Sequence, residues 1–212
     1  MTARTRLWAV GALLYLAFFC WYTDLRTPLT GQEVDNFVAE RLAAGNDSVQ
    51  IDNIAGFFRD DTGHQFLMLN AIDYNENPTD VAGAEPGETA QQLMGRYMAH
   101  MLPALLSRAS HPVVMGDAIY SVIDVVGIEN AEQWDSGALF RYRSRRTLMD
   151  IISNPEFAGE HHFKHAALAK TIAYPIEPQI YFGDLRWMLG LLILAITALV
   201  DSFVITRKKP SA

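Results

Sequence analysis

Three histidines on one expected helix are the residues best suited to chemistry. His161, His162 and His165 stand three and four positions apart, which can place two imidazoles on one helical face as ligands of a metal ion or a haem iron. The pattern has a histidine where zinc hydrolases of the His-Glu-x-x-His type carry their general-base glutamate, which removes that hydrolase mechanism. A solvated surface cluster with Glu160 and Lys164 paired explains the same spacing. A haem or a transition metal therefore stays open as a cofactor.

Polar residues on expected strands form a second candidate site. In the expected strand 66–74, Asn70 and Tyr74 share one face by period-two alternation. With Arg141 from a later strand and Tyr97 from the long helix, they could line an apolar cavity and orient a small anionic or carbonyl ligand. Structural roles explain the same residues, with Asn70 at a bulge and Arg141 paired with an aspartate across the sheet.

Asp201 is the third candidate, because it interrupts an apolar run near the C-terminus. A carboxylate within a membrane span usually faces protein or water, and small residues such as Gly190 let a second helix approach closely. Asp201 and Gly190 are therefore candidate contacts with a membrane partner. The alternative places Asp201 at the membrane interface, near Arg207.

Two uncharged runs, 7–22 and 187–200, indicate membrane spans, since a helix needs about 20 apolar residues to cross a bilayer. The first run also fits a cleaved signal peptide, but its bulky end offers no small-x-small cleavage site, which favours a retained anchor. Basic residues flank both runs at the chain ends: Arg4, Arg6, Arg207, Lys208 and Lys209. The positive-inside rule then predicts a bacterial inner-membrane protein with both termini cytoplasmic and a periplasmic central domain.

Composition excludes several classes of site. The chain has 212 residues, 50% of them hydrophobic, and a formal net charge of −7. A single cysteine, Cys20, rules out an intrachain disulfide and a cysteine-based zinc site. The only basic cluster of the central region is 141–146, which argues against nucleic acid as a partner.

The periodicity of the central region predicts an α+β domain. Strands are expected at 66–74, 112–124, 137–143 and 171–176, with helices at 88–108 and 145–170 between them. This β-α-β-β-α-β order is that of a ferredoxin-like sandwich, whose helix-free face commonly closes on a second copy as a dimeric α+β barrel. From the N-terminus, the expected domains are an anchor 1–23, a helical linker or lid 24–64, a ferredoxin-like domain 65–180, and a transmembrane helix with a basic cytoplasmic tail 181–212.

Three segments carry a family resemblance: FLMLNAIDY, YMAHMLPALLSRASHPVVMGDAI, and the stretch from FRYRSRR through NPEF to IEP. They resemble the domain of unknown function 1330 family, in the dimeric α+β barrel superfamily. The resemblance covers about residues 65–178. It implies a face-to-face dimer and little chemistry, since that family has no generally assigned activity. The two spans and the leading helices depart from its soluble members.

Two functions are consistent with these features. The first is a non-enzymatic one: a tethered ligand-binding dimer, or an accessory or assembly subunit of a membrane complex, with the bilayer, a second copy and other subunits as partners. The second is a haem- or metal-dependent enzyme of the oxygenase or isomerase type, working in the barrel cavity. We expect the first to be correct.

Overall fold

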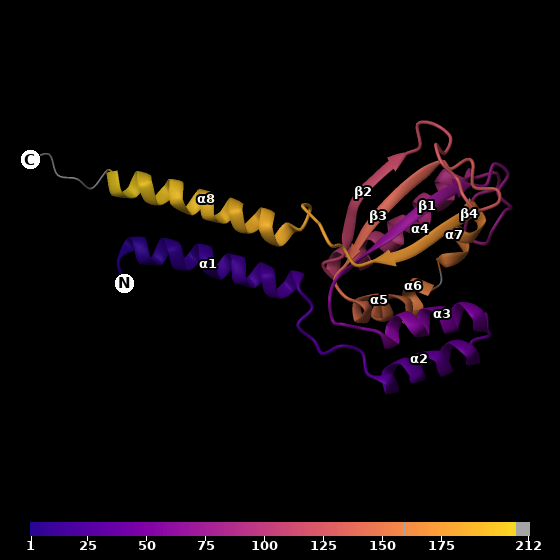
Figure 1. The fold of residues 1–212 in the computed structure, drawn as a ribbon, viewed down its shortest axis with the longest axis horizontal. Helices are drawn as coiled ribbons and strands as arrows, with labels where there is room; N and C mark the ends of the chain where they lie inside the picture. The colour runs from indigo at the N-terminus through magenta and orange to yellow at the C-terminus, as the bar shows by residue number, and fades with distance from the viewer. Residues whose placement is uncertain (159, 207–212) are drawn as a thin grey trace, which may run out of the picture. The chain divides into compact units, whose positions relative to one another are not determined.

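The computed structural model describes residues 1–158 and 160–206 and divides the chain into two compact units. The first unit contains both ends of the chain, from Met1 to Thr23 and from Gln179 onward, and the second runs from Asp24 to Pro178. Figure 1 shows the elements of each unit. The basic tail predicted from Arg207, Lys208 and Lys209 lies outside the described residues.

The second unit is a ferredoxin-like α+β domain, the fold class predicted from the sequence. Its four strands form one antiparallel sheet in the order β2-β3-β1-β4. Together with the connecting helices, this gives the β-α-β-β-α-β arrangement. In chain order, its elements are α2 (Gly31–Ala43), α3 (Ser48–Arg59), β1 (Phe66–Tyr74), α4 (Ala90–Ser107), β2 (His111–Asp117), β3 (Ser136–Tyr142), α5 (Arg145–Ile152), α6 (Pro155–Ala158), α7 (His161–Ala167) and β4 (Leu168–Ile176).

Local sequence signals explain where several helices begin. Thr30 and Glu33 form a capping box at the start of α2, in which each side chain accepts from the backbone N–H of the other. Thr89 and Gln92 do the same for α4. Before α6, the Asn154 side chain accepts from the backbone N–H of Glu156 at 3.0 Å. These bonds satisfy N–H groups that the first helical turn leaves without partners.

Helices α4 and α7 cover one face of the sheet (Figure 1). Apolar residues recur every fourth position of α4, which places them on one side of the helix. That side packs against α7 and the strands in a buried cluster made of Ala90, Leu93, Tyr97, Met101, Leu105, Ile151, Phe163 and Ala167. The long helix predicted for 88–108 is thus present, with Pro103 inside it.

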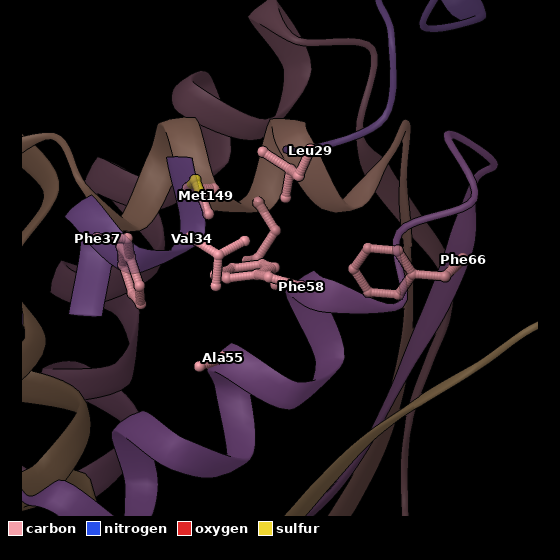
Figure 2. Close-up of a cluster of buried hydrophobic side chains, with 8 residues drawn as sticks. Leu29, Val34, Phe37, Ala55, Phe58, Phe66 and Met149 are labelled. Atoms are coloured by element: carbon pink, nitrogen blue, oxygen red, sulfur yellow. The ribbon is translucent and has the colours of Figure 1, made fainter. Parts of the chain in front are cut away.

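Helices α2 and α3 form a second core with α5 and the start of β1, as Figure 2 shows. Phe58 of α3 is completely buried, and its ring meets that of Phe37 edge-on at 5.3 Å between centroids. Met149 of α5 and Phe66 of β1 belong to the same cluster. Residues 24–64, expected as a separate linker or lid, therefore share a core and a compact unit with the sheet.

Two predicted boundaries differ from the structure. Strand β2 ends at Asp117, whereas the apolar pattern predicted a strand to Asp124. The last helix was expected to reach about residue 170, but β4 already begins at Leu168, which pairs with Tyr74 of β1. Pairing with β1 holds Leu168 in the strand conformation, although the sequence pattern alone favoured one more helical turn at this position.

The first unit consists of α1 (Ala3–Tyr22) and α8 (Leu185–Thr206). Both helices are long and apolar enough to cross a membrane. At about 1.5 Å per residue, the 20 residues of α1 extend about 30 Å, which is close to the hydrocarbon thickness of a bilayer. The two helices pack against each other within this unit.

Candidate functional site

The strand register separates the residues of the predicted cavity. Asn70 lies opposite Ala138, and Leu67 lies opposite Arg141, so Asn70 and Arg141 occupy alternating positions of the β1–β3 pair. Alternate residues point to opposite faces of a sheet. Tyr74 packs with the core under α4, on the face of Asn70, and Arg141 is on the other face. The structure therefore does not bring Asn70, Tyr74 and Arg141 together.

Each of these polar groups has a local role. The side-chain amide of Asn70 donates to the Met68 carbonyl at 3.1 Å. Arg141 is completely buried and donates from Nε to Gln65 Oε1 at 2.6 Å and from Nη1 to the Ala109 carbonyl at 2.5 Å. Tyr97 lies in the core of α4, where burial raises the pKa of its hydroxyl to about 12. The Asn70 bond stays within β1, whereas the Arg141 bonds join β3 to the segments before β1 and before β2.

The three histidines lie on α7 without converging. The His161 ring packs edge-on against Tyr97 with 5.3 Å between centroids and is 6.3 Å from the His165 ring. His162 Nε2 is 2.9 Å from the Ala82 carbonyl oxygen, and its ring contacts Phe163. Within residues 1–158 and 160–206, no group of three His, Cys, Asp or Glu side chains could hold a metal ion.

The helix-free face of the sheet carries an apolar surface that crosses all four strands. Its side chains alternate with those that pack under α4 and α7, and the register aligns them in two rows. In the order β2-β3-β1-β4, the first row is Val114, Leu139, Leu69 and Tyr174, and the second is Gly116, Gly137, Ala71 and Ile172. We call these eight residues the apolar rows.

The edges of the apolar rows are open to solvent. Val114 is 61% exposed, Tyr174 is 47% exposed and Ile172 is 36% exposed. The second row is built of small residues at its centre, so a partner surface can approach the backbone closely there. Contiguous exposed apolar surface on a folded domain usually marks an interaction site.

The connection between β2 and β3 exposes further apolar side chains. Ile119 is 99% exposed and Ile123 is 98% exposed, and the same segment also exposes Tyr120, Val122, Val125, Val126 and Ile128. Two backbone bonds hold the segment beside the chain that enters β3: Ala118 N–H to the Asp135 carbonyl at 2.7 Å and Val122 N–H to the Glu132 carbonyl at 2.9 Å. We call residues 118–128 the apolar arm.

A cavity of about 660 Å³ lies between the base of the apolar arm and the end of β1. Ile119 and Tyr120 line it from the arm, with Asp73, Glu76 and Asp135 from the other side. Asp135 is already engaged, because its Oδ2 accepts from the Tyr74 backbone N–H at 2.6 Å. The cavity is large enough for a small molecule and mostly polar.

The basic cluster 141–146 has a structural role that its sequence did not reveal. Arg145 donates to the Phe57 carbonyl at 2.7 Å and stacks on the Phe57 ring. Arg146 donates to the Thr27 and Pro28 carbonyls and pairs with Glu33. This pairing, with hydrogen bonds from Thr30, lowers the pKa of Glu33 to about 2. The arginines thus fasten the segment before α2, and α3 itself, to the start of α5.

Asp24 completes this junction at the first residue of the domain. Its buried carboxylate accepts from Ser144 Oγ at 2.5 Å and Arg26 Nη2 at 2.8 Å, and also from Thr147 Oγ1. Burial works to raise the pKa of Asp24, but the bonds from Arg26 and Ser144 outweigh it and hold the pKa well below its usual range. An acid at the start of α5 is also favoured by the helix dipole.

In the first unit, Asp201 and Gly190 contact the chain's own N-terminal helix. Asp201 is buried, pairs with Arg4 Nε at 3.0 Å and accepts from Trp8 Nε1 at 3.1 Å. A Cβ on Gly190 would lie 3.1 Å from the Tyr15 ring, so this glycine lets α1 come close. The partner helix implied by these two residues is therefore present in the same chain.

Comparisons with known proteins support the fold. No family model and no curated protein sequence matches the chain. Among solved structures, it is similar to a protein of unknown function from Rhodopseudomonas palustris, with 19% identity and a TM-score of 0.50 over 61% of this chain and 94% of the other. The methylated form of that protein matches with 18% identity and a TM-score of 0.52, over 62% and 93% of the two chains.

A third similar structure is a dimeric protein of unknown function with a ferredoxin-like fold from Bacteroides fragilis. It is 10% identical, covers 54% of this chain with 96% of its own, and has a TM-score of 0.32, too low to support an argument. At these identities, the two Rhodopseudomonas structures show a shared fold alone. The resemblance to the domain of unknown function 1330 family remains a resemblance.

Proposed function

We propose that the protein is a membrane-anchored α+β domain that works by association rather than catalysis, with a second copy of the chain as its first partner. The apolar rows carry this proposal, because they cross the whole sheet and are open at Val114, Ile172 and Tyr174. A second copy offers the same rows, and a twofold axis would set them face to face in an isologous interface. In this role, the protein would serve as an accessory or assembly subunit in a membrane complex.

The apolar arm supports the same proposal. Its residues are mostly β-branched and aromatic, the composition of a buried strand, yet Ile119 and Ile123 are almost fully exposed. Burial of each such side chain against a partner would contribute about 1.5 to 3 kcal/mol to the free energy of association. The arm and the rows therefore both expose apolar side chains that a partner could bury.

A single substitution in the rows tests the association. Tyr174→Lys places a charge in the interface, and we expect it to raise the dimer dissociation constant of the full-length protein by about tenfold or more. Leu42→Lys on α2 is the matched control, since Leu42 is 49% exposed and Tyr174 is 47% exposed. Native mass spectrometry from membrane-mimetic discs measures both. Equal dimer fractions in the two variants would refute the proposal.

The proposed location is the bacterial inner membrane, with both termini cytoplasmic and the domain of residues 24–178 periplasmic. The apolar helices α1 and α8 and the basic residues Arg4 and Arg6 support this topology. A reporter enzyme fused at Asn77, in the loop after β1, should be active only if the domain is exported. An inactive reporter at Asn77, in a fusion protein that is stably expressed, would contradict this topology.

The alternative hypothesis, a haem- or metal-dependent enzyme, predicts a bound cofactor. The donor groups do not fit a shared ion, because His161 packs on Tyr97 and His162 contacts the Ala82 carbonyl. Purified protein with a Soret band, lost in His161→Ala or His165→Ala, would support an enzyme over the association proposal.

A further inference from the structure

Helices α1 and α8 are joined along their whole length in an antiparallel register. Arg4 and Trp8 contact Asp201, Gly11 lies against Thr197, and Tyr15 lies against Gly190. At the other end, Arg186 donates to Thr23 Oγ1 and lies over the Tyr22 ring, 6.0 Å from its centroid. Positions therefore rise along α1 as they fall along α8, as in a closed helical hairpin.

Glycines and a threonine allow this close packing. A Cβ on Gly11 would be 2.8 Å from Thr197 Oγ1, a distance at which one of the two groups would have to move. Thr197 is itself buried, although most of α8 is exposed. Small residues are common where membrane helices pack together. The hydrophobic effect does not drive helices together within lipid, so close van der Waals packing has to do so.

The charges of the hairpin are placed at its two ends. Arg186 pairs with Asp184 at one end, and Arg4 pairs with Asp201 at the other, while 187–200 holds no charged residue. From Arg186 to Asp201, the helix rises only about 22 Å, which is less than the hydrocarbon thickness of about 30 Å. At least one end therefore reaches into the apolar layer, where an unpaired carboxylate is costly.

We infer that α1 and α8 cross the membrane as one hairpin in which α1, through Arg4 and Trp8, is the partner that holds Asp201, so that α1 is a retained span and not a leader. The buried side chain of Asp201 is 7% exposed, and both of its partners come from α1. Removal of α1 would leave this carboxylate against lipid. The inference is independent of whether the domain associates with a second copy.

Disulfide trapping in native membranes tests the hairpin. Cys20→Ser removes the native thiol, and Gly11→Cys with Thr197→Cys places two thiols on facing positions, where the ideal Cβ of residue 11 is 3.8 Å from the Thr197 Cβ. The control pair, Leu13→Cys with Leu199→Cys, lies on exposed faces of the same helices. After cleavage at a protease site inserted at Asn77, we expect only the first pair to hold the two fragments together.

A charge series tests the role of Asp201. Arg4→Leu should lower the trapping yield by about fivefold or more, because it leaves a carboxylate unpaired in the apolar layer. Arg6→Leu removes the same charge from the same helix end and should leave the yield unchanged. The double variant Arg4→Leu with Asp201→Leu should restore the yield.

Either of two results would overturn the inference. One is a mature protein whose N-terminus, read by intact-mass measurement, lies after Tyr22. The other is a trapping yield that falls equally in Arg4→Leu and Arg6→Leu, since that result would assign the effect to the charge of the terminus and not to the pair.

Discussion

At the scale of residues, Asp24 is the clearest case of a side chain that links two distant segments of the domain through hydrogen bonds. Three hydrogen-bond donors reach its carboxylate: the side chains of Arg26, Ser144 and Thr147. Two of them come from the start of α5, so the carboxylate ties the first residue of the domain to the element after β3. Removing one member of such a buried, charge-assisted group costs more than a typical surface substitution.

We expect Asp24→Asn to lower the free energy of unfolding by about 1 to 3 kcal/mol. Asp52→Asn, an exposed position on α3, is the control and should stay within about 0.5 kcal/mol. The folded-state pKa of Asp24 lies below its ordinary value of 3.8, so the stabilisation is fully present above that pH and is lost as the pH falls further. The difference between wild type and variant in urea titrations should therefore shrink from pH 6 to pH 3. A constant difference would show that the charge of Asp24 is not what stabilises the junction.

The candidate residues also show what a sequence pattern leaves open. Alternation correctly places Asn70 and Tyr74 on one face of β1, because this follows from strand geometry alone. The position of Arg141 relative to Asn70 depends on the register between β1 and β3, which long-range packing decides. The pattern therefore predicted an Asn-Tyr-Arg cavity that the register does not form.

At the scale of elements, the sequence predicted the helices and strands whose apolar residues are buried against other parts of the same domain. Helix α4 shows this, since its apolar residues four positions apart face the sheet. The pattern predicted that residues 24–64 are helical but not where α2 and α3 pack, because their burial depends on Phe66 and Met149, which are distant in sequence. It also predicted a strand beyond Asp117, where the apolar arm has the composition of a buried strand but leaves Ile119 and Ile123 almost fully exposed.

This mismatch leads to a prediction for the apolar arm. Ile119→Ser with Ile123→Ser should change the melting temperature of the monomeric fraction by less than about 2 °C, because both side chains are exposed. The same variant should weaken association measurably, since these residues supply part of the interface. Calorimetry and sedimentation velocity give the two readings. A large loss of stability with unchanged association would mean that the arm packs within its own chain.

At the scale of the whole molecule, the chain combines two compact units of different composition. Residues 24–178 form a ferredoxin-like domain with two cores, and the two terminal helices form an apolar hairpin with paired charges at its ends. Anchoring both ends of a domain in a membrane confines it to two dimensions and raises its local concentration, which favours association through a modest interface. The apolar rows are the surface of the domain best suited to that association.

The most direct test of the central claim is interchain disulfide trapping at the middle of the rows. In a Cys20→Ser background, Ala71→Cys lies at the centre of the sheet, between Gly137 and Ile172. Ser48→Cys, exposed at the start of α3, is the control. The association proposal predicts an interchain dimer for Ala71→Cys in native membranes and little for Ser48→Cys. A free, fully reactive thiol at Ala71→Cys, with no interchain product, would contradict it.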